Sequence, residues 1–117
     1  MKISVNEMGK VTVLELDGKL DLSSAADLKE RVKALLTERK TNLHLNMRRV
    51  DFINSSGLGA MVSLMKEIRV HRGRLTLSDL APYVSEIFEI TQLSHVFEIF
   101  QNVDEAVASY TTANTTA

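Results

Sequence analysis

The spacing of hydrophobic residues alternates along the chain between the period of a strand and the period of a helix. Apolar and polar residues alternate in the first 16 positions on both sides of Met8-Gly9-Lys10, which predicts two strands joined by a tight turn. Three later segments have the same strand character. The expected strands cover residues 3–5, 11–16, 42–47, 75–78 and 96–100, with residues 50–53 continuing the third strand toward a loop.

Apolar residues at helical spacing fill the intervals between the later strands. Ser24 followed by Asp27 is an N-terminal capping signal, and Gly73 after a basic turn is a typical helix end. Pro82 suits the first turn of a further helix. The expected helices run from about residue 24 to 36, from 57 to 71, from 82 to 90 and from 103 to 110.

The predicted order of elements is β-β-α-β-α-β-α-β-α, which is typical of an α/β fold. We expect one domain over residues 1–110, with a mixed sheet of about five strands covered by about four helices. The first two strands form an antiparallel hairpin, and the remaining strands pair mainly in parallel. Residues 111–117 lack apolar periodicity and are expected to form a flexible tail.

Composition excludes several classes of protein. The 117 residues are 44% hydrophobic and 25% charged, as in globular proteins, and the net charge of −1 lacks the basic excess of a nucleic-acid-binding protein. Cysteine is absent and the three histidines are scattered, so we expect neither a metal site nor a cofactor. No apolar run suits a signal peptide or a membrane span, which predicts a cytoplasmic protein without a membrane partner.

The segment Asn-Ser-Ser-Gly-Leu-Gly at residues 54–59 is the strongest candidate site, because it joins a strand to a helix at the carboxyl end of the sheet. It fits none of three enzymatic motifs. Val62 stands where a dinucleotide fingerprint needs glycine or alanine, and Ala60 stands where a P-loop needs lysine. Ile53 and Asn54 precede the serines, where a hydrolase elbow needs a glycine. We therefore do not expect an enzyme.

Two interpretations of this segment remain open. Asn54, Ser55 or Ser56 can simply cap the helix. However, two serines exceed what one cap needs, and each glycine in the first helical turns costs about 0.5–1 kcal/mol relative to alanine. The second interpretation is a docking face for another protein. Small residues at helical spacing would form it: Ser56, Gly59, Ala60 and Ser63.

The chain resembles the STAS-domain anti-sigma-factor antagonists of bacterial partner-switching systems. The resemblance is carried by Gly18-Lys19-Leu20-Asp21 and by the ten residues from Val50 to Gly59, VDFINSSGLG. The ending Phe97-Glu98-Ile99-Phe100 is also similar. The resemblance extends to about residue 108, and it implies a STAS-like fold and a regulatory protein without catalysis.

Within such a family, the protein binds a serine-kinase anti-sigma factor and thereby releases a sigma factor. The resemblance implies that the kinase phosphorylates Ser55, with Ser56 as the second choice, and that a metal-dependent serine phosphatase removes the phosphate. We expect the free protein to be a monomer. The implied partner-binding residues are Asp21, Asn54, Ser55, Ser56, Gly57, Gly59, Ala60 and Ser63.

Two positions depart from the family pattern. Asn54 and Asn46 stand where the family usually has aspartate, which makes this rim less acidic. One hypothesis is that Arg48 or Arg49 helps to retain a phosphate, because guanidinium groups pair well with phosphate. Asp21 has the alternative role of a carboxylate that stabilises a helix start. The alternative function is an unphosphorylated accessory subunit of another assembly, such as a phospholipid-transport ATPase.

Overall fold

A five-stranded sheet with four α-helices forms the protein in the computed structural model, which describes residues 1–115 and the side chains through Thr111. In chain order, the elements are β1 (Lys2–Met8), β2 (Val11–Leu20), α1 (Leu22–Thr37), β3 (Asn42–Ile53), α2 (Ser55–Val70), β4 (Arg74–Ser78), α3 (Pro82–Ile90), the 3-10 turn η1 (Leu93–His95), β5 (Glu98–Phe100) and α4 (Val103–Thr115).

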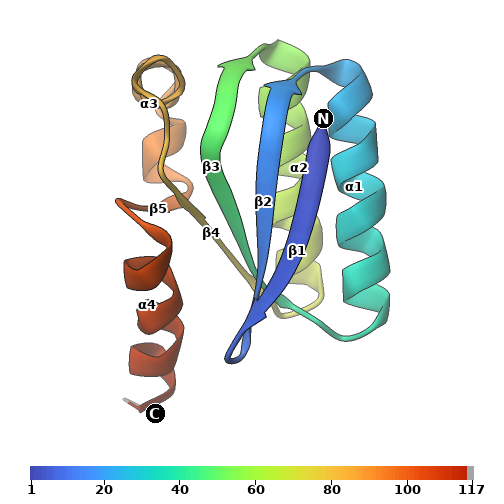
Figure 1. The fold of residues 1–117 in the computed structure, drawn as a ribbon, viewed down its shortest axis with the longest axis vertical. Coiled ribbons are helices and arrows are strands. Elements are labelled where there is room, and N and C mark those ends of the chain that lie inside the picture. The colour runs from blue at the N-terminus through green and yellow to red at the C-terminus, as the bar shows by residue number, and fades with distance from the viewer. Residues whose placement is uncertain (116–117) are drawn as a thin grey trace.

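The strands lie side by side in chain order, β1-β2-β3-β4-β5. Strands β1 and β2 pair antiparallel, and the other neighbours pair in parallel. Figure 1 shows α1 and α2 side by side along one side of the sheet, with α4 apart from them beside β4 and β5. The predicted mixed sheet with an antiparallel hairpin at its start is confirmed.

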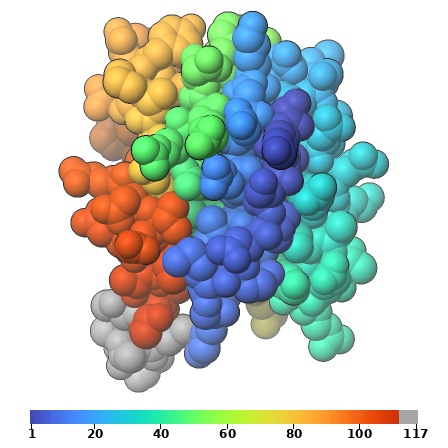
Figure 2. All heavy atoms as spheres, in the orientation of Figure 1, coloured from blue at the N-terminus to red at the C-terminus, as the bar shows by residue number. Residues whose placement is uncertain are grey.

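The larger hydrophobic core lies between the sheet and the helices α1, α2 and α3. Alternate residues of each strand enter it, such as Leu14 and Leu16 of β2, because successive side chains of a strand point to opposite faces. On the opposite face, Tyr110 of α4 packs on Val11 and Val13 in a second, smaller cluster. That face of β1 and β2 is otherwise open to solvent, as Figure 2 shows.

Strand β3 is longer than the sequence pattern indicated. Residues 42–47 and 50–53 belong to one continuous strand, in which β3 has an extra residue relative to β2 at two places. Such bulges shift the alternation of side chains, so Met47 and Val50 both reach the core while Arg48 and Arg49 stay exposed. Only residues 42–46 pair with β4, and the rest of β3 extends past it.

Several predicted boundaries differ from the structure. Strand β2 continues to Leu20, and α2 begins at Ser55. Helix α1 begins at Leu22, because Asp21 rather than a serine caps it. Strand β5 is limited to residues 98–100, because residues 93–97 close a turn in which the N–H groups of Val96 and Phe97 both donate to the Leu93 carbonyl. Helix α4 continues to Thr115, past the predicted end at Tyr110, since extending a helix is easier than starting one. The rest of the predicted tail, residues 116–117, lies outside the described residues.

A network of buried polar side chains connects α4 to the sheet by hydrogen bonds. The Tyr110 hydroxyl donates to the Leu43 carbonyl at 2.8 Å and lies 3.0 Å from the Thr76 hydroxyl. The His44 ring contacts Thr76 Oγ1 through Nδ1 at 2.8 Å and Ser78 Oγ through Nε2 at 2.7 Å. The sequence predicted His44 as a packing or surface residue, and the structure buries it completely.

We expect His44 to weaken the fold in mild acid. Burial lowers the pKa of His44 to about 4, although the nearby Asp79 carboxylate opposes this shift. Between pH 6.5 and 4 the unfolded chain therefore binds a proton that the folded chain excludes, so the stabilisation is complete above pH 6.5 and is lost toward pH 4. Urea unfolding should show about 2 kcal/mol of this loss between pH 7 and pH 5. The variant His44→Gln should not show this loss of stability between pH 7 and pH 5. Equal pH dependence of the two proteins would contradict the role assigned to His44.

Candidate functional site

The carboxyl ends of β2 and β3 form the edge that carries the candidate site. Leu20 and Ile53 are partners in the parallel register, and a helix begins directly after each strand. The N–H of Asn54 donates to the Leu20 carbonyl at 3.3 Å. The structure therefore brings Asp21 and the segment 54–59 together, as expected for residues at the carboxyl ends of neighbouring parallel strands.

Asn54 is the N-cap of α2. Its backbone is extended, with φ of −116°, and its Oδ1 accepts a hydrogen bond from the Gly57 N–H at 3.0 Å. The Asn54 carbonyl accepts the Leu58 N–H at 2.9 Å, which is the first hydrogen bond of the helix. Of the three possible caps, the structure thus selects Asn54, and neither serine is needed for that purpose.

Ser55 and Ser56 are the first two residues of α2, and both are exposed. Within the described part of the chain, neither hydroxyl has a hydrogen-bond partner. Their backbone N–H groups belong to the first turn of the helix, where the helix itself offers no acceptor. Two hydroxyls and two amide groups are therefore available at one helix start.

Asp21 caps α1 in a reciprocal arrangement with Ser24. Its Oδ1 accepts the Ser24 N–H at 3.1 Å, and its own N–H donates to Ser24 Oγ at 2.9 Å. The Ser24 N–H is the main cause that lowers the pKa of Asp21. Asp21 thus has the predicted role at the helix start, while its side chain remains partly exposed beside the candidate site.

The small face predicted on α2 is only partly exposed. Gly59 and Ser63 face solvent, but Gly57 and Ala60 are buried and offer no surface to a partner, which corrects their assignment. A Cβ on Gly57 would lie 2.3 Å from the Leu20 carbonyl oxygen, so this glycine is required where α2 approaches β2. A Cβ on Gly59 would meet nothing within 4 Å. No contact within the fold therefore explains Gly59.

A shallow groove continues this face between α1 and α2. Its volume is about 270 Å³, and Ser63 lies on its α2 wall. The groove is lined by Lys29, Val32, Lys33, Ser63, Leu64 and Glu67. Two lysines on α1 thus border the small face.

Leu22 is a residue that the sequence reasoning missed. It directly follows Asp21 at the start of α1, and 74% of it is exposed. Apolar spacing assigns only buried positions of a helix, so an exposed leucine at a helix start carries no signal in that pattern. Its place at the same edge as Ser55 adds an apolar element to the candidate site.

Arg49 lies away from the serines. It is exposed on β3, and its Nε is 3.4 Å from Glu15 Oε1 of the neighbouring strand. It precedes the strand end at Ile53 by four residues, a separation of about 13 Å along an extended chain. Asn46 accepts the Arg48 N–H at 3.0 Å and so supports the bulge of β3. The structure does not bring these residues to Ser55.

The described residues do not gather the ligands of a metal site. Among residues 1–115 no cluster of three histidine, aspartate or glutamate side chains could hold a metal ion. None of the helices within those residues is long and apolar enough to cross a membrane. At the candidate site, the groups that face solvent are the hydroxyls of Ser55 and Ser56 and the small residues Gly59 and Ser63.

Known proteins are similar to this chain in sequence and in fold. BtrV of Bordetella bronchiseptica is 27% identical over 113 residues and is matched over 97% of both chains. The anti-sigma-B factor antagonist of Listeria monocytogenes is 31% identical over 87 residues, 74% of this chain and 75% of the relative. The Bacillus anti-sigma factor antagonist SpoIIAA has the same fold, with a TM-score of 0.72 in its unphosphorylated form, at 19% identity over 95% of this chain and 98% of SpoIIAA.

The family assignment rests on nearly the whole chain. The model of the STAS domain matches residues 2–106, which include the loop at 54–59 and all five strands. The match agrees with the resemblance carried by the motifs around Asp21 and Ser55. This chain therefore belongs to the STAS domain family.

Proposed function

We infer that this protein is an anti-sigma factor antagonist that binds a serine-kinase anti-sigma factor and is switched off by phosphorylation at Ser55. The relatives named anti-sigma-B factor antagonist support the general role. Such proteins regulate by binding and are not enzymes. The proposed docking surface consists of exposed and partly exposed residues at the carboxyl edge and on α2: Asp21, Leu22, Asn54, Ser55, Ser56, Gly59 and Ser63. The protein would act in the cytoplasm.

The observation that carries the proposal is the division of roles between Asn54 and Ser55. Because Asn54 takes the Gly57 N–H, the Ser55 hydroxyl stays free and exposed at the first position of α2. A phosphate there adds about −1.5 to −2 charges at pH 7. The positive end of the helix dipole and the free amides of the first turn stabilise such a charge. The modified protein would thus keep its fold while its docking surface changes in charge and bulk.

The relative SpoIIAA provides support for a switch without refolding. Its structures in the unphosphorylated and phosphorylated forms resemble this chain to the same degree, with TM-scores of 0.72 and 0.71. The serine kinase would supply the phosphate from ATP, and a metal-dependent serine phosphatase would remove it. Asn54 leaves no carboxylate directly before Ser55, so the phosphate would not face a negative charge from that neighbour.

The experiment is intact mass measurement with site mapping on protein purified from its native host. We expect a phosphorylated fraction in the wild type and in Ser56→Ala, with the phosphate mapped to Ser55, and none in Ser55→Ala. The variant Ser55→Ala should retain stability within about 0.5 kcal/mol of the wild type, because Ser55 is exposed and Asn54, not Ser55, is the cap. Loss of the phosphate would then reflect loss of the acceptor hydroxyl.

Two results would contradict the proposal. Phosphate that persists in Ser55→Ala and disappears in Ser56→Ala would move the switch to the second serine. Absence of phosphate across growth phases and stresses, together with co-purification with a transport ATPase, would favour an unphosphorylated accessory subunit.

A further inference from the structure

Strand β1 is an edge strand with an unprotected outer side. It has seven residues, and among the described residues no other strand pairs with that side. Proteins commonly protect a long edge with proline, a bulge or charged side chains. The middle of β1, Ile3-Ser4-Val5-Asn6, has none of these, and 39% of Val5 is exposed. The edge is therefore open to pairing with a further strand.

The hairpin geometry shows which backbone groups of β1 are free. The loop has two residues, with Met8 opposite Val11, and the φ of 62° at Gly9 is typical of the first loop position in a type II′ turn. The residues that flank such a loop form a hydrogen-bonded pair, and hydrogen-bonded pairs then alternate along the ladder. Every second residue from Met8 back to Lys2 therefore bonds to β2. The residues whose N–H and C=O groups point away from the sheet are Ile3, Val5 and Glu7.

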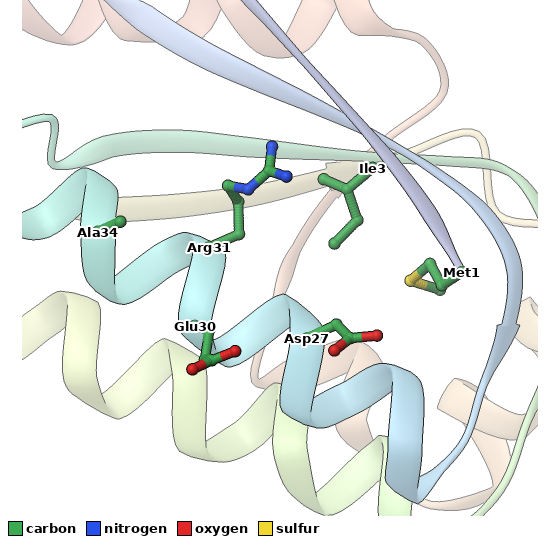
Figure 3. A pocket seen from close by; sticks show the side chains of 6 residues that line it. All are labelled: Met1, Ile3, Asp27, Glu30, Arg31 and Ala34. Carbon is green, nitrogen blue, oxygen red and sulfur yellow. The ribbon is translucent and has the colours of Figure 1, made fainter.

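A groove of about 400 Å³ lies beneath this open edge, between β1 and the overhanging helix α1 (Figure 3). Figure 3 shows the Asp27 carboxylate turned toward Met1. None of the three charged side chains in the groove is in an ion pair within the described residues. Two carboxylates and one guanidinium give the groove a net negative charge. Its lining residues are Met1 and Ile3 on the β1 side and Asp27, Glu30, Arg31 and Ala34 on α1.

The free backbone groups and the groove are offered to the same residues of an added strand. Ile3 and Val5 belong to the helix side of the sheet, since they pair with the buried Leu16 and Leu14. Residues that lie directly opposite each other in a sheet have their side chains on the same face. In an added strand, the residues opposite Ile3 and Val5 would therefore bond to the free backbone groups and direct their side chains into the groove.

The overhang of α1 limits what can pair with β1. On the helix side, the space beyond the edge already contains α1. A domain that brought its own helix layer to that side, such as a second copy of this chain paired through its own β1, would place a helix where α1 lies. A single extended segment without a covering helix meets no such obstacle, because α1 would cover its inner side.

We propose that the β1 edge binds an extended basic segment of another protein, which pairs antiparallel with β1 as a sixth strand. In an antiparallel ladder, one opposite residue bonds to both the N–H and the C=O of Ile3, and another does the same for Val5. Apolar side chains at these two positions would fill the groove. A lysine or arginine two residues further on, opposite Met1, would approach Asp27, and the net negative charge of the groove favours such a cation.

This site is separate from the proposed docking surface. The groove and the β1 edge share no residue with it, and Ser55 lies on a different helix. The inference therefore does not rest on the proposed function, and a segment bound at β1 would leave Ser55 available to a second partner.

Titration with a peptide, followed by NMR of the full chain, tests the proposal. The probe is Ser-Val-Thr-Val-Thr-Lys-Ser, acetylated at its N-terminus and amidated at its C-terminus. We expect saturable binding that slows hydrogen exchange at the amides of Ile3 and Val5, which should exchange fast in the free chain. The amides of Ser4 and Asn6 should be protected in both states, because they already bond to β2. A Val5 amide that is protected without peptide, or no binding at roughly 1 mM peptide, would overturn the proposal.

The variant Val5→Pro removes one outward N–H that no bond to β2 uses. Proline is tolerated on an edge strand where its nitrogen faces solvent, so far-UV circular dichroism should be unchanged. We expect this variant to bind the peptide about tenfold more weakly. The control Val5→Thr keeps the N–H and should bind like the wild type. Equal affinity of the proline variant and the wild type would contradict strand pairing at β1.

Exchange of charges gives a result that does not depend on the proline variant. Asp27→Lys should lose about threefold in affinity for the lysine peptide, as expected for a surface ion pair, and should gain affinity for the analogue with glutamate in place of lysine. The control Glu86→Lys changes an exposed carboxylate on α3 and should bind both peptides like the wild type. If Asp27→Lys and Glu86→Lys respond alike, the segment does not lie in the groove.

Discussion

Replacing Gly57 by alanine is expected to destabilise the fold by about 2–3 kcal/mol and to lower the Tm by roughly 10 °C. The new Cβ would lie 2.3 Å from the Leu20 carbonyl oxygen and 3.1 Å from Cγ1 of Ile53. The first of these atoms is backbone at the end of β2, so it cannot move aside by a change of rotamer. Helix α2 would have to shift, and Asn54 would lose its capping geometry with the Gly57 N–H.

The matched control is Gly59→Ala, two residues along the same helix. A Cβ there meets nothing within 4 Å, so the substitution should stabilise the fold by about 0.5–1 kcal/mol through helix propensity. Thermal and urea unfolding of the two variants should therefore give changes of opposite sign. A Gly57→Ala protein as stable as the wild type would show that α2 and β2 do not approach as closely as the structure indicates.

Much of the fold follows from the periodicity of the sequence. Strands β1, β2 and β4 alternate apolar and polar residues, and the helices place their apolar residues three and four positions apart. Because this periodicity reflects which face is buried, it predicted the order of elements, the hairpin and the mixed sheet. Periodicity does not reveal a bulge. It therefore predicted two segments, residues 42–47 and 50–53, where the structure has the single strand β3.

Periodicity predicts less about the site. It predicted where the loop 54–59 lies, because strand ends and helix starts have recognisable residues. It could not assign the cap among Asn54, Ser55 and Ser56, since all three side chains can accept an amide hydrogen bond. Nor could it distinguish Gly57 from Gly59: one is buried against Leu20 and the other is open. That difference depends on how closely a helix approaches a strand that lies more than thirty residues earlier in the chain.

Differences in exposure explain why Ala60 was assigned wrongly and why Leu22 was missed. Ala60 follows Gly59 in the sequence, but the helical rotation of about 100° turns it into the core, where it is 8% exposed. Leu22 is apolar and yet lies outside the core, because it occupies the first position of α1 at the edge of the molecule. In both cases the type of the residue does not show whether its side chain is buried or exposed. The corrected surface is smaller and has an exposed leucine at its border.

Replacing Ser63 by tryptophan is expected to weaken binding of the cognate anti-sigma factor at least tenfold. Ser63 is exposed one turn beyond Gly59, at the groove between α1 and α2. If the partner approaches this small face closely, an indole must be accommodated where the interface has no room, and the loss of packing costs more than about 1.4 kcal/mol. The dissociation constant for the purified partner, measured by titration calorimetry, gives the result.

The control substitution is Ile90→Trp, at the end of α3. Ile90 is 74% exposed and lies on a helix outside the proposed docking surface, so the same indole should leave the affinity unchanged. Both variants should unfold at the temperature of the wild type, because neither side chain is buried. An affinity that is equal in the wild type and in Ser63→Trp would exclude the α2 face from the interface. A loss in both variants would place the contact elsewhere, closer to α3.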